Sequence, residues 1–173
     1  APPSGLPDYS GYLDMCPVEA ADTDRDASVC FEAEEKAIRN DPSIRPVCDT
    51  DAATTPLSDG DYRLNVLGDE RWSTGNQWAE WTFSVRESGY YTITFRAAQW
   101  YNDGRPSYRQ IMLDGKVPFR ELLAYEIPYS RKWQNITLSD NGGTPYRFFL
   151  ESGQHTLRLT VKIGYMAAIS NEL

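Results

Sequence analysis

Aromatic side chains lie beside planar polar side chains in three turn-rich segments, "GDERWSTGNQ", "AAQWYNDGRPSY" and "EIPYSRKWQN". A sugar ring has an apolar face surrounded by hydroxyl groups, so an aromatic ring with nearby amide, carboxylate or guanidinium groups suits it. The segments therefore favour a carbohydrate-binding surface. Arg96 is also a candidate, because it lies on the polar face of the predicted strand "YYTITFRAA". The predicted ligand-binding residues are Trp72, Asn76, Arg96, Trp100, Tyr101, Asn102, Asp103, Arg105, Tyr129 and Trp133.

An alternative stays open for the tryptophans in these segments. A loop tryptophan can cover the core beneath its own loop instead of facing a ligand. A single loop tryptophan does not distinguish the two roles, whereas three segments of the same composition favour a ligand surface.

Residues for catalysis do not form a recognisable set. The chain has no G-x-S-x-G, H-E-x-x-H, phosphate-binding or dinucleotide-binding motif. Its single histidine, His155, opens a predicted strand just after a turn, where local hydrogen bonding is typical. A glycoside hydrolase would need two carboxyl groups at a set separation across a cleft. A domain this small rarely carries such a cleft, so we expect no enzyme and keep a hydrolase as an alternative, with the candidates Glu80, Asp103, Glu121 and Glu126.

The charge balance narrows the choice of partners. The chain of 173 residues has a formal net charge of -8 and no run of Lys or Arg. Such a surface repels phosphate backbones and anionic lipid headgroups. No stretch approaches the roughly 18 consecutive apolar residues of a membrane-spanning helix. We therefore expect no nucleic-acid partner and no membrane insertion.

The cysteines do not indicate a metal site. Cys16, Cys30 and Cys48 form no C-x-x-C pair, and His155 is far from them in the sequence, so zinc is not expected. A disulfide between two of the three remains an alternative to free thiols, and their spacing does not select a pair.

Strand-like alternation dominates the middle of the chain. In "WAEWTFSV", the side chains of Ala79, Trp81, Phe83 and Val85 fall on one face and polar side chains on the other. The segments "YYTITFRAA" and "YRQIMLDG" repeat this pattern, and "YRFFLESG" with "HTLRLTVKIG" form a last predicted pair. The amphipathic helices that a parallel sheet needs between its strands are missing. The pattern predicts an all-β fold, an antiparallel β-sandwich.

The two ends of the chain differ from this middle part. Residues 1–28 are rich in Pro, Gly and Ser and then in acidic residues, which predicts an irregular N-terminal tail or linker. Residues 29–163 form the predicted β-sandwich module. Residues 164–173 read as the start of a helical segment that is cut short, so we expect the chain to be part of a longer protein.

The segment "LDGKVPF" combines a tight turn with an aromatic residue, Phe119, that is predicted to close one end of the core as a plug. Asp114 and Gly115 supply the positive φ angles that such a turn needs. Pro118 ends or confines the following strand because it lacks an N–H donor. Phe119 is then predicted to fold back onto the sandwich.

The order of several motifs resembles a known family. "FEAEEKA", "WAEWTFSVRESGYYTITFRAA", "YRQIMLDGKVPFRE" and "FFLESGQHTLRLTV" follow one another over residues 29 to 163. This order is similar to a galactose-binding-like jelly-roll sandwich, as in carbohydrate-binding modules of the family-thirty-five type. A module of the extracellular solute-binding proteins of bacterial ABC transporters is also similar, through "LDGKVPF", Pro128 with Trp133, and the segment from Phe149 to Leu157.

The resemblance implies an extracellular or cell-surface protein with an oligosaccharide or polysaccharide partner. It also implies packing against the remainder of the parent polypeptide. A structural calcium ion is common in such modules, and Glu32 and Glu34 match the positions that hold it, although no matching acid is evident near the last strand. The alternative function is a structural or protein-interaction module, in which the loop aromatics are interface anchors.

Overall fold

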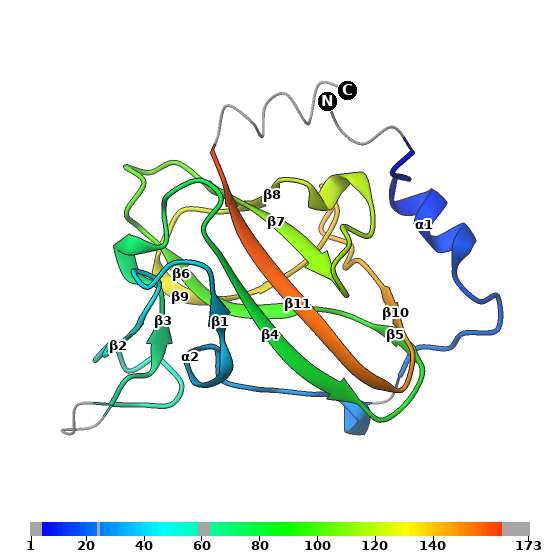
Figure 1. Cartoon of the computed structure of the whole chain (residues 1–173), viewed down its shortest axis with the longest axis horizontal. Coiled ribbons are helices and arrows are strands. Elements are labelled where there is room, and N and C mark those ends of the chain that lie inside the picture. Colours follow the sequence, from blue (N-terminus) through cyan, green and yellow to red (C-terminus); the bar gives the residue numbers. More distant parts are fainter. Residues whose placement is uncertain (1–4, 24, 59–62, 164–173) are drawn as a thin grey trace.

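The computed structural model describes residues 5–23, 25–58 and 63–163, and its main element is a five-stranded antiparallel sheet (Figure 1). Strand β11 is central in this sheet, because it pairs with β4 on one side and with β7 on the other. The strands lie in the order β1 (Ile38–Arg39), β4 (Trp78–Val85), β11 (Gly153–Lys162), β7 (Ser107–Leu113) and β8 (Tyr125–Ile127).

Two strand pairs lie across the core from this sheet. They are β5 (Gly89–Tyr91) with β10 (Phe148–Leu150), and β6 (Thr94–Gln99) with β9 (Ser130–Thr137). A further short pair joins β2 (Pro46–Val47) to β3 (Val66–Leu67). All these pairings are antiparallel, and Figure 1 shows β6 and β9 behind the large sheet. The predicted all-β antiparallel sandwich is therefore confirmed.

The core begins as a row of apolar side chains across the three central strands. Trp81 of β4 faces Leu157 of β11, which faces Leu113 of β7. All three side chains are buried. Each fully buried apolar side chain of this size contributes roughly 1.5–3 kcal/mol through removal of its surface from water. The alternation in the sequence thus places one face of every central strand in the core.

Phe119 closes one end of the sandwich, as the sequence predicts. A turn with reciprocal backbone hydrogen bonds between Leu113 and Lys116 reverses the chain. Asp114 and Gly115 have φ angles of 49° and 77° in this turn. Phe119 is fully buried, and its ring lies against those of Tyr9, Tyr12, Tyr146 and Phe148, with the Tyr146 centroid 4.9 Å away.

The helices of the described residues are short, and none is long and apolar enough to cross a membrane. The α-helices are α1 (Tyr9–Met15) and α2 (Ala33–Lys36), and the 3-10 helices are η1 (Arg25–Ala27), η2 (Asp69–Arg71) and η3 (Arg120–Leu122). The segment 164–173, predicted to begin a helix, lies outside the described residues.

Helix α1 corrects the expectation of an irregular N-terminal tail. The Asp8 side chain caps the helix by accepting a hydrogen bond from the Gly11 N–H, and caps of this kind favour helix formation by about 1 kcal/mol. The Tyr9 and Tyr12 hydroxyls accept hydrogen bonds from the backbone N–H groups of Arg147 and Phe149. Helix α1 therefore covers the edge of β10 that β5 leaves free. The domain boundary at residue 28 stays a prediction.

His155 joins the last strand to the Asp114 turn through both ring nitrogens. Its Nδ1 lies 2.7 Å from the Asp114 carboxylate, and its Nε2 lies 2.6 Å from the Glu151 carbonyl oxygen. Two acceptors favour the protonated ring, which has two N–H donors. Burial alone lowers the pKa of His155, but the hydrogen bonds to Glu151 and Asp114 outweigh it, and the pKa is raised above its ordinary value.

We expect Phe119→Ala to lower the free energy of unfolding by about 3–5 kcal/mol, because it leaves a cavity inside the aromatic cluster. Urea denaturation followed by circular dichroism measures this change. Lys116→Ala, at the exposed tip of the same turn, is the control and should change stability by less than about 0.5 kcal/mol. A similar small effect for both variants would contradict the role of Phe119 as the plug.

We expect the His155 contacts to stabilise the protein at low rather than high pH. A group with a raised folded-state pKa stabilises fully below its unfolded pKa, and this stabilisation is lost as pH rises through the folded pKa. The free energy of unfolding should therefore fall more between about pH 6 and pH 9 for the natural protein than for His155→Gln. Urea titrations across this range test the prediction, and parallel pH profiles would rule it out.

Candidate functional site

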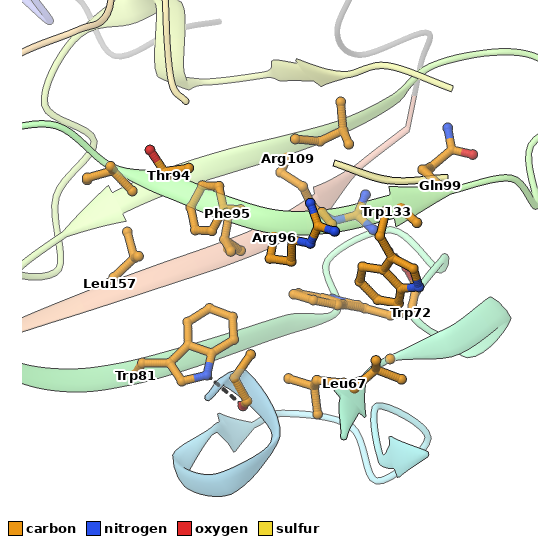
Figure 2. A pocket seen from close by; sticks show the side chains of 18 of the residues that line it. Leu67, Trp72, Trp81, Thr94, Phe95, Arg96, Gln99, Arg109, Trp133 and Leu157 are labelled. Atoms are coloured by element: carbon orange, nitrogen blue, oxygen red, sulfur yellow. Dashed lines mark hydrogen bonds between the residues drawn. The ribbon is translucent and has the colours of Figure 1, made fainter. Parts of the chain in front are cut away.

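A cavity of about 1170 Å³ lies between β6 and the segments around β2, β3 and η2 (Figure 2). Its walls include core-facing side chains of the large sheet, among them Trp81, Leu159 and Arg109, so it reaches into the sandwich. Phe119 does not line it. One end of the sandwich is therefore filled by aromatic rings, while this part remains open to a ligand.

The cavity brings together several of the residues predicted from sequence. They come from the loop after η2, from β6 and the loop that follows it, and from β9. The predicted residues that line the cavity are Trp72, Arg96, Trp100, Tyr101, Asn102 and Trp133.

The other predicted residues lie outside the cavity, for local reasons. Asn76 adopts a φ of 69° and accepts a hydrogen bond from Asn40 through its backbone oxygen. Asp103 sits with Gly104 at the tip of the loop between β6 and β7, with φ angles of 46° and 78°. Both angles are positive, as a tight turn of this loop requires.

Arg105 and Tyr129 are likewise absent from the cavity lining. Arg105 is exposed and follows the turn of the loop between β6 and β7, where its N–H donates to the Asn102 carbonyl. The Tyr129 hydroxyl accepts a hydrogen bond from Nε of Arg131 at 3.0 Å. Arg105 and Tyr129 lie in the predicted loops, but their residue types alone do not determine the direction of their side chains.

The segment after β2 holds Trp133 and Arg96 in place. The Trp133 indole N–H donates to the Asp49 carboxylate at 3.1 Å. The Arg96 guanidinium donates to the Ala53 carbonyl at 2.9 Å and to the Asn135 side-chain oxygen at 3.3 Å. Both side chains are thus oriented before any ligand binds, which lowers the entropic cost of binding. Asp49 was not predicted, because it is distant from both residues in the sequence.

Tyr101 offers an aromatic platform at the rim. Half of this residue is exposed, at 51%, and its ring lies 5.2 Å from that of Trp100. Its hydroxyl donates to the Asp69 carboxylate at 2.7 Å. This hydrogen bond raises the pKa of Tyr101 to about 12 and, as the largest cause, lowers the pKa of Asp69. The ring is consequently fixed as a neutral platform beside a carboxylate.

The Trp72 side chain packs against the core and also lines the cavity. Its ring lies 6.3 Å from that of Trp81, and the guanidinium of Arg109 lies over it at 5.1 Å (Figure 2). Trp72 therefore covers the core beneath its own loop, as the alternative predicted, and also lines the cavity. Arg109 was not predicted, although a charged residue in phase with Ile111 and Leu113 is a signal that the sequence contains.

The carboxylates considered for hydrolysis do not line the cavity. Glu80 pairs with Arg158 at 2.8 Å, Glu121 accepts from the Tyr9 backbone N–H at 3.1 Å, and Glu126 accepts from the Tyr108 hydroxyl at 3.4 Å. Each of these three glutamates therefore has a structural partner, and Asp103 lies at the tip of the loop between β6 and β7.

Glu32 and Glu34 do not belong to a cluster of three metal-ligating side chains in the described part of the chain. Glu32 precedes α2 without a side-chain capping bond, and Glu34 lies in its first turn. Burial, followed by repulsion from Glu32 and Glu35, raises the pKa of Glu34. Among the described residues, no three His, Cys, Asp or Glu side chains are grouped closely enough to hold a metal ion. Calcium needs six to eight oxygen ligands, so we derive no role for it.

The thiols of all three cysteines are free in the structure. Cys30 is exposed and Cys48 is half-buried, and both line the cavity. Cys16, the C-cap residue of helix α1, donates to the Tyr12 carbonyl.

Comparison with known proteins relates the fold to carbohydrate-binding modules. No family model and no curated protein matches the sequence. A family 35 carbohydrate-binding module from Clostridium thermocellum matches the structure with a TM-score of 0.54 at 18% sequence identity, covering 78% of this chain and 86% of the module. The chain therefore has a β-sandwich fold similar to that of this module.

Two larger enzymes contain a similar fold. A cycloisomaltooligosaccharide glucanotransferase from Paenibacillus sp., in complex with cycloisomaltoheptaose, matches with a TM-score of 0.54 and 18% identity over 78% of this chain. A GH26-CBM35 β-(1,4)-mannanase from Podospora anserina matches with a TM-score of 0.51 and 16% identity over 80% of this chain. The chain spans only 16% of the first enzyme and 25% of the second.

We expect Tyr101→Phe to raise the pKa of Asp69 towards its ordinary value, because the substitution removes the hydrogen bond that lowers it most. Carboxyl ¹³C NMR titration of the protein and the variant measures this shift. Tyr129→Phe is a matched control whose hydroxyl contacts Arg131 instead. An unchanged Asp69 titration in Tyr101→Phe would contradict the described contact.

Proposed function

We propose that this domain is a non-catalytic carbohydrate-binding module. The supporting observation is the cavity that gathers Trp72, Trp100, Tyr101 and Trp133 beside the polar side chains of Arg96 and Asn102. Aromatic faces suit the apolar faces of sugar rings, and planar polar groups suit their hydroxyls.

Tyr101 and Trp133 are proposed as the main stacking residues, since each is fixed by a hydrogen bond to a carboxylate. Asp69 and Asp49 retain other lone pairs, so each carboxylate can also accept a hydrogen bond from a sugar hydroxyl. Asn102 uses its side-chain N–H group for the Pro106 carbonyl and leaves its side-chain oxygen as an acceptor. A rim site of this kind buries little surface, and we expect Kd values of roughly 10⁻⁵ to 10⁻³ M.

We further propose that the domain belongs to a larger extracellular or cell-surface protein. The related fold forms a small part of two carbohydrate-active enzymes, which favours a module that works beside other domains. The resemblance of "LDGKVPF" and the last strands to solute-binding proteins of ABC transporters makes glycan capture for import a specific form of this proposal.

A glycan array followed by calorimetry tests the proposal. The probes include cycloisomaltoheptaose, which is bound in the Paenibacillus enzyme, and β-(1,4)-mannooligosaccharides. We expect Tyr101→Ala to weaken binding of the best glycan about tenfold, which corresponds to a loss of about 1.4 kcal/mol of stacking.

Tyr129→Ala is a control that tests whether binding depends on residues that line the cavity or on any aromatic residue of the predicted loop segments. Tyr129 lies in a predicted aromatic segment but does not line the cavity, so this variant should bind as the natural protein does. If no glycan binds at millimolar concentration, carbohydrate binding is wrong, and an interaction module becomes the better interpretation.

A further inference from the structure

Arg109 occupies a core position of β7. Ile111 and Leu113 alternate in phase with it and are buried on the core face. Across the ladder, Arg109 pairs with the buried Val161 of β11. Because residues at i, i+2 and i+4 of a strand share one face, Arg109 projects into the space between the layers. Packing alone would favour an apolar side chain there.

The charge of Arg109 has no partner of opposite sign in the described part of the chain. Its guanidinium donates to the backbone carbonyls of Trp72, at 2.9 Å, and of Tyr108, at 3.0 Å. None of the ion pairs between described residues includes it. Protein atoms surround the group, although the cavity leaves part of the side chain accessible. Burial lowers the pKa of Arg109 to about 10, because a desolvated cation is disfavoured.

Two other polar atoms around the cavity are buried without a hydrogen-bond partner in the described residues. They are the indole nitrogen Nε1 of Trp72 and the side-chain oxygen Oε1 of Gln99. Both residues line the cavity, and Figure 2 shows them with Arg109 in its wall. Buried polar groups in folded proteins are nearly always paired. The Trp72 indole N–H is a donor that an anionic ligand beside Arg109 can complete, whereas Gln99 Oε1 is an acceptor and needs a donor that such a ligand does not supply.

The inner walls of the cavity do not suit a sugar. A sugar hydroxyl that is buried without a hydrogen bond costs about 1–3 kcal/mol, and apolar side chains from both layers form these walls. They are Trp81, Phe95, Ile127, Leu159 and Val161.

We propose that the interior of this cavity binds an unbranched aliphatic monocarboxylate, with its carboxylate against Arg109 and its chain along the apolar walls. A carboxylate matches the planar guanidinium and accepts two parallel hydrogen bonds from it. Its single charge neutralises the single cation, whereas a phosphate dianion would leave a surplus buried charge. The volume of about 1170 Å³ accommodates such a chain. This function is separate from carbohydrate binding at the rim and does not rest on it.

Binding of decanoate below its micelle-forming concentration, measured by calorimetry and tryptophan fluorescence, tests the proposal. Decanol and decyltrimethylammonium carry the same chain with no charge and with a positive charge. We expect decanoate to bind with a Kd on the order of 10⁻⁵ M and decanol at least about tenfold more weakly. The cation should not bind, because Arg109 repels it. The proposal is overturned if decanoate and decanol bind equally well, or if decanoate does not bind at about 1 mM.

Substitutions of arginine residues test whether the carboxylate of decanoate binds next to Arg109. We expect Arg109→Met to reduce decanoate affinity to that of decanol and Arg109→Lys to retain part of it, since a lysine keeps the charge without the planar fork. Arg86→Met removes an exposed arginine outside the cavity and should have no effect. An equal loss in Arg86→Met and Arg109→Met means surface binding and overturns the proposal.

A measurement on the natural protein avoids any effect of Arg109 variants on folding. The carboxyl ¹³C signal of labelled decanoate reports its titration in the bound state. Pairing with a buried guanidinium favours the ionised carboxylate, so we expect the pKa of bound decanoate to lie below that of free decanoate. An unchanged or raised pKa overturns the proposal. The glycan array tests carbohydrate binding independently.

Discussion

The structure depends on burial of one face of β11, the central strand of the five-stranded sheet. Leu157 and Leu159 of β11 lie between β4 and β7, and both neighbouring strands present apolar residues opposite them. A register shift by one residue would turn every one of these side chains to the other face. The alternation of the three strands therefore fixes their pairing, and the layer formed by β5, β6, β9 and β10 covers the resulting surface.

The same row of side chains explains why the two ends of the sandwich differ. Towards the Asp114 turn, the row continues into the aromatic cluster around Phe119, which is fully buried and does not line the cavity. In the other direction β7 presents Arg109 where an apolar residue would complete the row. A long charged side chain does not fill an apolar space, since its guanidinium must reach hydrogen-bond acceptors. The cavity thus begins where the apolar pattern of β7 ends.

Local patterns in the sequence were sufficient to predict strands β4, β7 and β11, the Asp114 turn and the burial of Phe119, because alternation and turn chemistry act over a few residues. The expected pairing of the last two strands is wrong, since β10 pairs with β5 while β11 pairs with β4 and β7. Strand β9, which holds Trp133, was expected to be a loop, because its mixed sequence shows no alternation. Helix α1 escaped prediction because Tyr9 and Tyr12 are held by contacts with residues more than 100 positions away, such as Phe119, Arg147 and Phe149. Tertiary packing, rather than propensity, stabilises short helices of this kind. Carbohydrate-binding candidates were predicted by residue type, which selects loops but does not give side-chain direction.

The position of Arg109 shows how a sequence can contain a functional signal that residue types alone do not reveal. An arginine in a loop is ordinary, whereas an arginine in the phase of Ile111 and Leu113 is predicted by the alternation itself to enter the core. Removing a cation from water is costly unless another charge or a set of hydrogen bonds replaces the lost hydration. Two backbone carbonyls and the Trp72 ring replace only part of it. Stability alone would favour an apolar side chain, so the site is better explained by a ligand than by the fold.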